Sequence, residues 1–305
     1  MIKSSIVKIA MSLVIMLTLA SSSFAQDNRQ WWNSLPTAWK KIFQQMELKG
    51  RNVDPTDEQL QEMVTAKHID CNGNKEIENL KPLARLTLIE TIDCSNTNIT
   101  SLDGIEGLSN LTDLDCSNND NINSLIPVTT LMNLTTLNCG NTMVKSLAPL
   151  RNHTKLRKLD VHFCTVNNLG LIGELKNLIE LNVSQNQSLF SLNGVEKLTS
   201  LVQLDCSETN VNDLTPLTNM KALETINLAY TKVPTLRPLQ NVRTLKEVDC
   251  SDTKITAASL DYFYSHLRLQ FLRARNLNIE QRQIDDFTTS FTKRNVNCDV
   301  IITKK

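Results

Sequence analysis

The sequence predicts an α/β fold in the form of a curved solenoid, with a parallel β-sheet on its concave face, a helical cap before the sheet and helix-containing coils at the far end. All three tryptophans precede a long repeat, and the repeat lengthens after residue 256. Such units cannot bury their apolar faces alone, so they must stack. The repeat itself is seen in one slot that recurs every 22 or 23 residues: Ile89, Leu111, Leu134, Leu156, Leu178, Leu201, Leu223 and Leu245.

The first 25 residues have the pattern of a secretory signal peptide. Lys3 and Lys8 precede an apolar run over residues 9–20, and Ser23-Phe24-Ala25 provides a small-residue cleavage site. The apolar run is too short for a membrane helix, which needs about 20 residues. We therefore expect an exported chain that is periplasmic, on the cell surface or extracellular, with no transmembrane segment in its mature part.

Composition restricts the classes of function. The chain has 32 basic and 32 acidic residues and contains no basic block, so it does not have the electrostatic pattern of a nucleic-acid-binding protein. With 41% apolar residues it can build a large core. We predict a folded protein with no nucleic-acid partner.

Residues 26–65 predict a helical N-terminal cap. One helix is expected behind Pro36, and a second from about Asp54-Pro55-Thr56 to Val64, with the proline in its first turn. The tryptophans allow an alternative interpretation as an aromatic binding module. A cap is favoured because the first coil of a solenoid otherwise leaves its apolar end open. The apolar residues at helical spacing are Trp39, Ile42, Phe43 and Met46.

Residues 66–256 contain the regular units, which share eight positions. A period of 20 to 29 residues with the pattern L-x-x-L-x-L-x-x-N is that of a leucine-rich repeat. This pattern resembles the bacterial internalin-like class of leucine-rich repeat proteins, as does its L-x-P-L variant at residues 80–83, 147–150, 214–217 and 236–239. The resemblance implies ligand binding through the concave sheet and no chemistry from the fold itself. In one unit the eight positions are Ile89, Ile92, Cys94, Thr97, Ile99, Leu102, Ile105 and Leu108.

Residues 257–305 depart from the regular pattern. Helices are expected at 257–266 and at about 280–293, where they would replace the short convex segments and close the far end of the solenoid. One apolar stripe of the first helix is expected to contain Leu260, Phe263, Tyr264 and Leu267.

The eight cysteines are predicted to be buried free thiols. Seven of them share a slot with Val161, Val183 and Leu228, which marks an apolar core position, and Cys164 falls in a column of threonine and asparagine. Cysteines of successive coils would lie about 4.8 Å apart, whereas a disulfide prefers about 3.8 Å between Cβ atoms. A disulfide between cysteines of successive coils nevertheless remains an alternative. The seven are Cys71, Cys94, Cys116, Cys139, Cys206, Cys250 and Cys298.

We predict no enzyme, no metal site and no cofactor. The chain has no C-x-x-C pair, no nucleophile motif and no glycine-rich phosphate loop. His162 and Cys164 are close in sequence, but their positions relative to the strand place them on opposite faces.

The concave face is the candidate binding site, and its residues fall into columns. One column runs through Asp93, Asp115, Asp160, Asp205 and Asp249 with asparagines between some of them. It is interpreted either as short polar residues that bond one another and water, or as an acceptor track for sugar hydroxyls, a cation or a basic protein surface. The full set of candidate residues is Asp93, Asp113, Asp115, Lys158, Asp160, His162, Phe163, Glu180, Asp205, Tyr230, Asp249, Phe271, Arg273 and Arg275.

Two aromatics interrupt the polar columns. Phe163 and Tyr230 occupy one column three coils apart, or about 14 Å, and are candidate anchors for a partner. The alternative is that each ring only packs against its neighbours. The sequence thus predicts an exported module that binds a protein through the concave sheet, with a carbohydrate-binding surface or envelope protein as the alternative. A purely structural envelope role is a third interpretation.

Overall fold

The computed structural model describes residues 24–295 and 297–305. The predicted signal peptide therefore lies, apart from its last two residues, outside the described residues. Within the described part, no helix combines the length and the apolar character that crossing a membrane requires.

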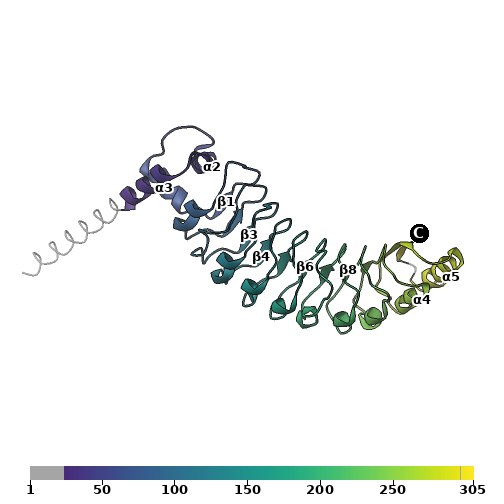
Figure 1. The fold of residues 1–305 in the computed structure, drawn as a ribbon. Coiled ribbons are helices and arrows are strands. Elements are labelled where there is room, and N and C mark those ends of the chain that lie inside the picture. Colours follow the sequence, from purple (N-terminus) through teal and green to yellow (C-terminus); the bar gives the residue numbers. More distant parts are fainter. Residues whose placement is uncertain (1–23, 296) are drawn as a thin grey trace, which may run out of the picture.

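Eleven parallel strands form a single sheet in chain order, and Figure 1 shows the coils stacked along an arc with the strands on the inner side. From β1 to β10 each strand pairs with the next without a register shift, so equivalent residues of successive coils lie side by side. This confirms the predicted curved solenoid. The strands are β1 (His68–Asp70), β2 (Thr91–Asp93), β3 (Asp113–Asp115), β4 (Thr136–Asn138), β5 (Lys158–Asp160), β6 (Glu180–Asn182), β7 (Gln203–Asp205), β8 (Thr225–Asn227), β9 (Glu247–Asp249), β10 (Phe271–Leu277) and β11 (Asp299–Lys304).

The outer side of the arc is made of short 3-10 helices. Five of them carry proline in their first turn, where its fixed φ and missing N–H cost nothing. These segments return the chain to the start of the next strand. They are η1 (Lys81–Arg85), η2 (Ile126–Thr130), η3 (Ala148–Leu150), η4 (Gly170–Ile172), η5 (Val195–Lys197), η6 (Thr215–Leu217), η7 (Arg237–Asn241) and η8 (Asp261–Phe263).

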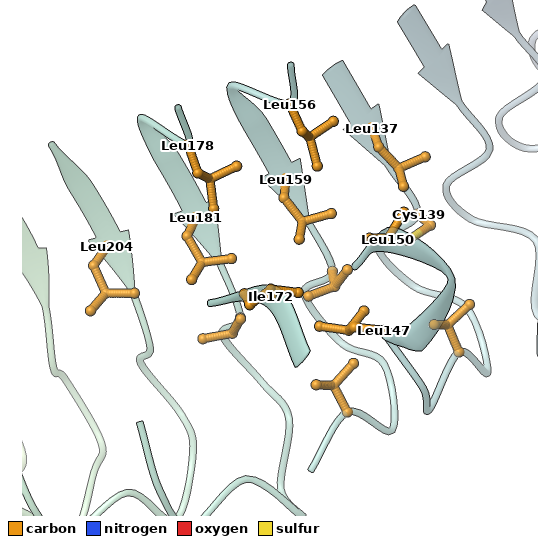
Figure 2. Packing of buried hydrophobic residues seen from close by; sticks show 14 of the residues in the cluster. Leu137, Cys139, Leu147, Leu150, Leu156, Leu159, Ile172, Leu178, Leu181 and Leu204 are labelled. Atoms are coloured by element: carbon orange, nitrogen blue, oxygen red, sulfur yellow. The ribbon is translucent and has the colours of Figure 1, made fainter. Parts of the chain in front are cut away.

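The core consists of columns of equivalent apolar residues. Figure 2 shows Leu137, Leu159, Leu181 and Leu204 projecting in parallel from successive strands, and each is at most 2% exposed. Burial of one such side chain contributes about 1.5–3 kcal/mol. Because every coil contributes to the same columns, the core is continuous along the solenoid.

The turn after each strand exists in two lengths. In the 22-residue coils a threonine fills the polar column, except for Cys164 in the coil at 156–177; the hydroxyl of Thr142, for example, donates to Cys139 O at 2.7 Å. In the 23-residue coils at 111–133 and 178–200 an asparagine takes its place, and one more residue follows it. Asn119 is buried, and its Nδ2 donates to the carbonyls of Cys94, Cys116 and Ser117 at 2.9, 3.0 and 3.2 Å. The longer amide side chain thus spans the longer turn.

The segment before the sheet is helical and packs on the first coil. Residues 24–34, α2 (Thr37–Leu48) and α3 (Asp57–Val64) are the helices. Trp39 is 1% exposed, and its indole nitrogen donates to Asn79 O at 3.1 Å. Thr56 caps α3 in a reciprocal bond with Gln59, so Pro55 precedes the cap and does not lie in the first turn as predicted.

The last coils contain α4 (Ala257–Leu260) and α5 (Gln281–Thr292). The expected helix over 257–266 is only partly α-helical, because η8 follows α4 directly. Leu267 was wrongly included in the apolar stripe, since it is 73% exposed. Tyr264 instead packs against α5, with its ring centroid 5.3 Å from that of Phe287.

Candidate functional site

The aspartates at the strand ends close the turns that follow them. Asp93 Oδ1 accepts hydrogen bonds from the backbone nitrogen of Ser95 at 3.0 Å and from its hydroxyl at 2.6 Å. The same pair of bonds joins Asp115 to Ser117 and Asp205 to Ser207. This is an Asx-type turn, in which a short acceptor replaces a backbone carbonyl. The strand-end column therefore has a structural task in nearly every coil.

Asparagines separate many of these carboxylates. Asn138 Nδ2 donates to Asp115 Oδ2 at 2.8 Å, and Asn182 and Asn227 make the same bond to Asp160 and Asp205 at 3.1 and 3.0 Å. From β3 to β8 a neutral donor thus stands between like charges, which lowers their repulsion. These contacts favour the interpretation of polar residues that bond one another. Direct ligand contact by Asp93, Asp115, Asp160, Asp205 and Asp249 stays a prediction.

The column at the start of the strands is less occupied by internal bonds. Gln203 and Glu247 are exposed, and neither side chain forms a hydrogen bond or ion pair within residues 24–295 and 297–305. Lys158 and Glu180 form an ion pair of 2.8 Å that is partly exposed and so weak. The predicted residues Asp113 and Phe271 belong to the same column and are half-buried.

The inner face is hollowed over its centre. A depression of about 430 Å³ extends from β4 to β8, and it brings together four of the predicted site residues, Lys158, Asp160, Glu180 and Asp205. Gln203, which was not predicted, also lines it. Asp160 Oδ1 also lies 2.7 Å from His162 Nδ1. Arg273 and Arg275 are exposed on β10, away from this depression.

Phe163 and Tyr230 occupy a column whose backbone is left-handed. Their φ angles are 47° and 57°, and they are 58% and 57% exposed. Most other coils use asparagine, aspartate or glycine here, which tolerate positive φ, and two use Gln185 and Glu208, whereas a bulky ring is strained. Our sequence reasoning missed this constraint, although the recurrence of Asn96, Asn118, Asn141 and Asp252 was its signal. The predicted exposure of both rings is confirmed, and both residues have a strained backbone conformation.

The two aromatic rings differ in their polar contacts. The phenol of Tyr230 lies near Asp252, whose negative charge raises the pKa of the phenol above its ordinary value. The side chain of Phe163 has no polar group. The hydrogen bonds between equivalent side chains of neighbouring coils, such as Asn141 to Asn118 at 2.9 Å, are therefore interrupted at Phe163. The ring of Phe163 is therefore an apolar surface with no internal polar role.

The cysteines contribute packing and not reactivity. All eight are free, and seven are buried. Burial raises the pKa of Cys71 to about 12 and that of Cys94 well above its ordinary value. Each of several thiols donates to a strand-end carbonyl of the next coil, as Cys94 does to Asp115 O at 3.3 Å. No group of three or more His, Cys, Asp or Glu suited to a metal occurs among the described residues.

Comparisons with known proteins agree with this architecture. No family model and no curated protein matches the chain. Among solved structures, an internalin, InlF of Listeria monocytogenes, is similar at 19% identity and a TM-score of 0.68, covering 88% of this chain and 89% of its own. A leucine-rich repeat protein of Leptospira interrogans gives 20% identity and a TM-score of 0.70, covering 79% of this chain and 62% of its own.

A third similar structure comes from a plant. It is the peptide hormone receptor RGFR1 in complex with RGF2, at 18% identity and a TM-score of 0.57, covering 78% of this chain and 37% of its own. At such identities the shared property is the fold. The chain is a leucine-rich repeat solenoid with the internalin-like fold.

Proposed function

We propose that this chain is an exported binding module that recognises a protein ligand through the inner face of its sheet. The observation that carries the proposal is the difference between the two strand columns. Side chains at the strand ends are used in turns, whereas Gln203 and Glu247 at the strand starts have no bond to any described residue. These two side chains have no structural task and are available for contact with a ligand.

The shape and chemistry of the inner face also support protein binding. A sheet of parallel strands offers a broad, shallow surface, and the central depression of about 430 Å³ is open and not enclosed. The complex of the plant receptor RGFR1 with RGF2 shows that a similar fold accommodates a peptide ligand. Raised thiol pKa values and the absence of a metal cluster among the described residues give no support to an enzymatic role.

The test is an affinity capture from envelope extracts and culture medium with residues 26–305 as bait. The site variant is Gln203→Lys with Glu247→Lys. The control is Glu174→Lys with Asn219→Lys, which likewise replaces one carboxylate and one amide side chain by lysine, but on the outer segments. All baits must first show equal thermal midpoints.

A partner captured by the wild-type chain and the outer-face control, but lost from the site variant, would support the proposal. Equal capture by all three baits would reject the inner face as the site. Because the strand-end aspartates are left intact, loss of capture cannot be attributed to broken turns.

A further inference from the structure

A recess of about 420 Å³ lies beside the sheet, at the turns that follow β4 and β5. It is distinct from the depression on the inner face, since none of the residues lining one also lines the other. Its lining includes Met143 and Phe163, which are 56% and 58% exposed. Two large apolar side chains are thus exposed to solvent within one recess.

The recess follows from the two turn lengths described above. The turns of the two 22-residue coils, with Met143 and Thr165, lie between two longer turns. The longer turns contribute Asp120 on one side and Gln187 with Ser188 on the other, and all of these residues line the recess. The recess is therefore lined on either side by residues of the longer turns, with the two shorter turns between them.

Several polar side chains that line the recess have donor or acceptor atoms that form no hydrogen bond with the described residues. Asp120 and Ser188 form no side-chain hydrogen bond with any described residue. Gln187 uses only its amide nitrogen, which donates to Glu208 O at 2.7 Å, and Asn141 likewise uses only Nδ2. Among the side chains that line the recess, free hydrogen-bond acceptors thus outnumber free donors, and they lie near the apolar side chains of Met143 and Phe163.

The charges of the residues that line the recess restrict the class of ligand that it can bind. No lysine, arginine or histidine lines the recess, so a phosphate or an acidic sugar would find no counter-charge there. Asp120 is the single charged residue of the lining, and the other polar groups are amides and hydroxyls. A neutral ligand with several hydroxyl donors and one apolar face matches this arrangement.

We propose that the recess binds a neutral pyranose unit of a carbohydrate. The ring of Phe163 packs against the C–H face of the sugar, and Asp120, Asn141 and Gln187 accept hydrogen bonds from its hydroxyls. This site goes beyond the proposed protein interface. It also differs from the acceptor track predicted on the sheet, where the aspartates are already bonded to their own turns.

The structure offers a matched pair of variants for the test. Phe163→Asn introduces the residue that this column carries at Asn96, Asn118 and Asn141, and removes the platform without opposing the backbone. Tyr230→Asn makes the corresponding change three coils away, outside the recess. Asp120→Ala removes one acceptor from an exposed turn and is not expected to prevent folding.

The probes are methyl glycosides of glucose, galactose, mannose and N-acetylglucosamine and their β-linked disaccharides, titrated by saturation-transfer difference NMR and calorimetry. We expect saturable binding of at least one probe, weakened at least about ten-fold by Phe163→Asn and by Asp120→Ala. Binding should be unchanged in Tyr230→Asn and in the Gln203→Lys with Glu247→Lys variant. That last variant separates a failure of this site from a failure of the protein interface.

Three results would overturn the proposal. The first is that no neutral saccharide binds. The second is that the recess variants bind as the wild-type chain does. The third is that choline or arginine amide binds the recess more tightly than every sugar, which would make it a site for cations.

Discussion

The ring of His162 lies over Gly140 of the adjacent coil, in the space that a Cβ on Gly140 would occupy. Half of the ten coils have serine at the equivalent position, including Ser95, Ser117 and Ser184. Glycine makes room for the imidazole, which reaches Asp160 Oδ1 at 2.7 Å. The departures from serine at Gly140 and His162 are therefore one structural feature.

Substitution of Gly140 by serine is expected to displace the imidazole and break its contact with Asp160. We predict a loss of about 1 kcal/mol in the free energy of unfolding, the usual value of one hydrogen bond. Urea unfolding of Gly140→Ser, His162→Ser and the double variant measures this as a double-mutant cycle. The double variant should recover most of the loss. Additive losses would show that the two residues are not coupled.

Phe163→Asn is expected to raise stability while it weakens sugar binding. A bulky residue at positive φ costs about 1–2 kcal/mol relative to the right-handed region, and asparagine tolerates this backbone better. We predict a gain of about 1 kcal/mol in the free energy of unfolding. The measurement is a denaturant midpoint at pH 7. A clear loss of stability would mean that the ring packs usefully against its neighbours.

The same substitution at Tyr230 provides the comparison for stability. Tyr230→Asn also relieves a strained φ, but it removes the contact between the phenol and Asp252. The gain should therefore be smaller than at Phe163. Equal gains would show that the Asp252 contact contributes nothing to stability.

Asn119→Ala is expected to be among the more damaging single substitutions in a turn. It leaves the buried carbonyls of Cys94, Cys116 and Ser117 without the amide donor, at a cost of about 2–4 kcal/mol. Thr142→Ala, in a 22-residue coil, removes a single bond to Cys139 O and should cost about 1 kcal/mol. Thermal unfolding of both variants tests the difference. Similar losses would contradict the view that the asparagine supports the longer turn.

Two buried histidines predict that stability falls in mild acid. His153 and His266 replace a core leucine, and each Nε2 lies 3.0 Å from a carbonyl of the preceding coil. Burial lowers the pKa of both imidazoles. The unfolded chain takes up protons near pH 6.5, whereas the folded chain takes them up only at lower pH. Stability is therefore complete above pH 6.5 and is lost as the pH falls below it.

His153→Leu tests this pH dependence, because leucine fills the equivalent slot at Leu108. The free energy of unfolding should fall less between pH 7 and pH 5 in the variant than in the wild-type chain. The groups facing His153 are the carbonyl of Val128 and the backbone of Leu150, whereas His266 also faces Arg243. An unchanged pH profile would reject His153 as a contributor.

The fold could be predicted from the sequence because each coil repeats one packing problem. A slot occupied by Ile89, Leu111 and Leu134 at a fixed period specifies stacked strands without knowledge of any other detail. The site was harder to predict, because a column of aspartates looks the same whether it contacts a ligand or its own turn. Only the three-dimensional structure shows that Asp93 bonds Ser95. The recess depends on differences in turn length between coils, which are visible in the sequence only when the coils are compared.

The separation of turn-forming and surface side chains has a consequence for how this protein changes over time. Residues such as Asp205 are tied to their coil, whereas Gln203, two positions earlier on the same strand, is not. Selection can therefore alter the second kind of position without a folding penalty. A lineage that duplicates, deletes or diversifies coils would inherit a finished scaffold and need to adjust only its exposed row. New recognition specificities would then be reached by point mutation alone.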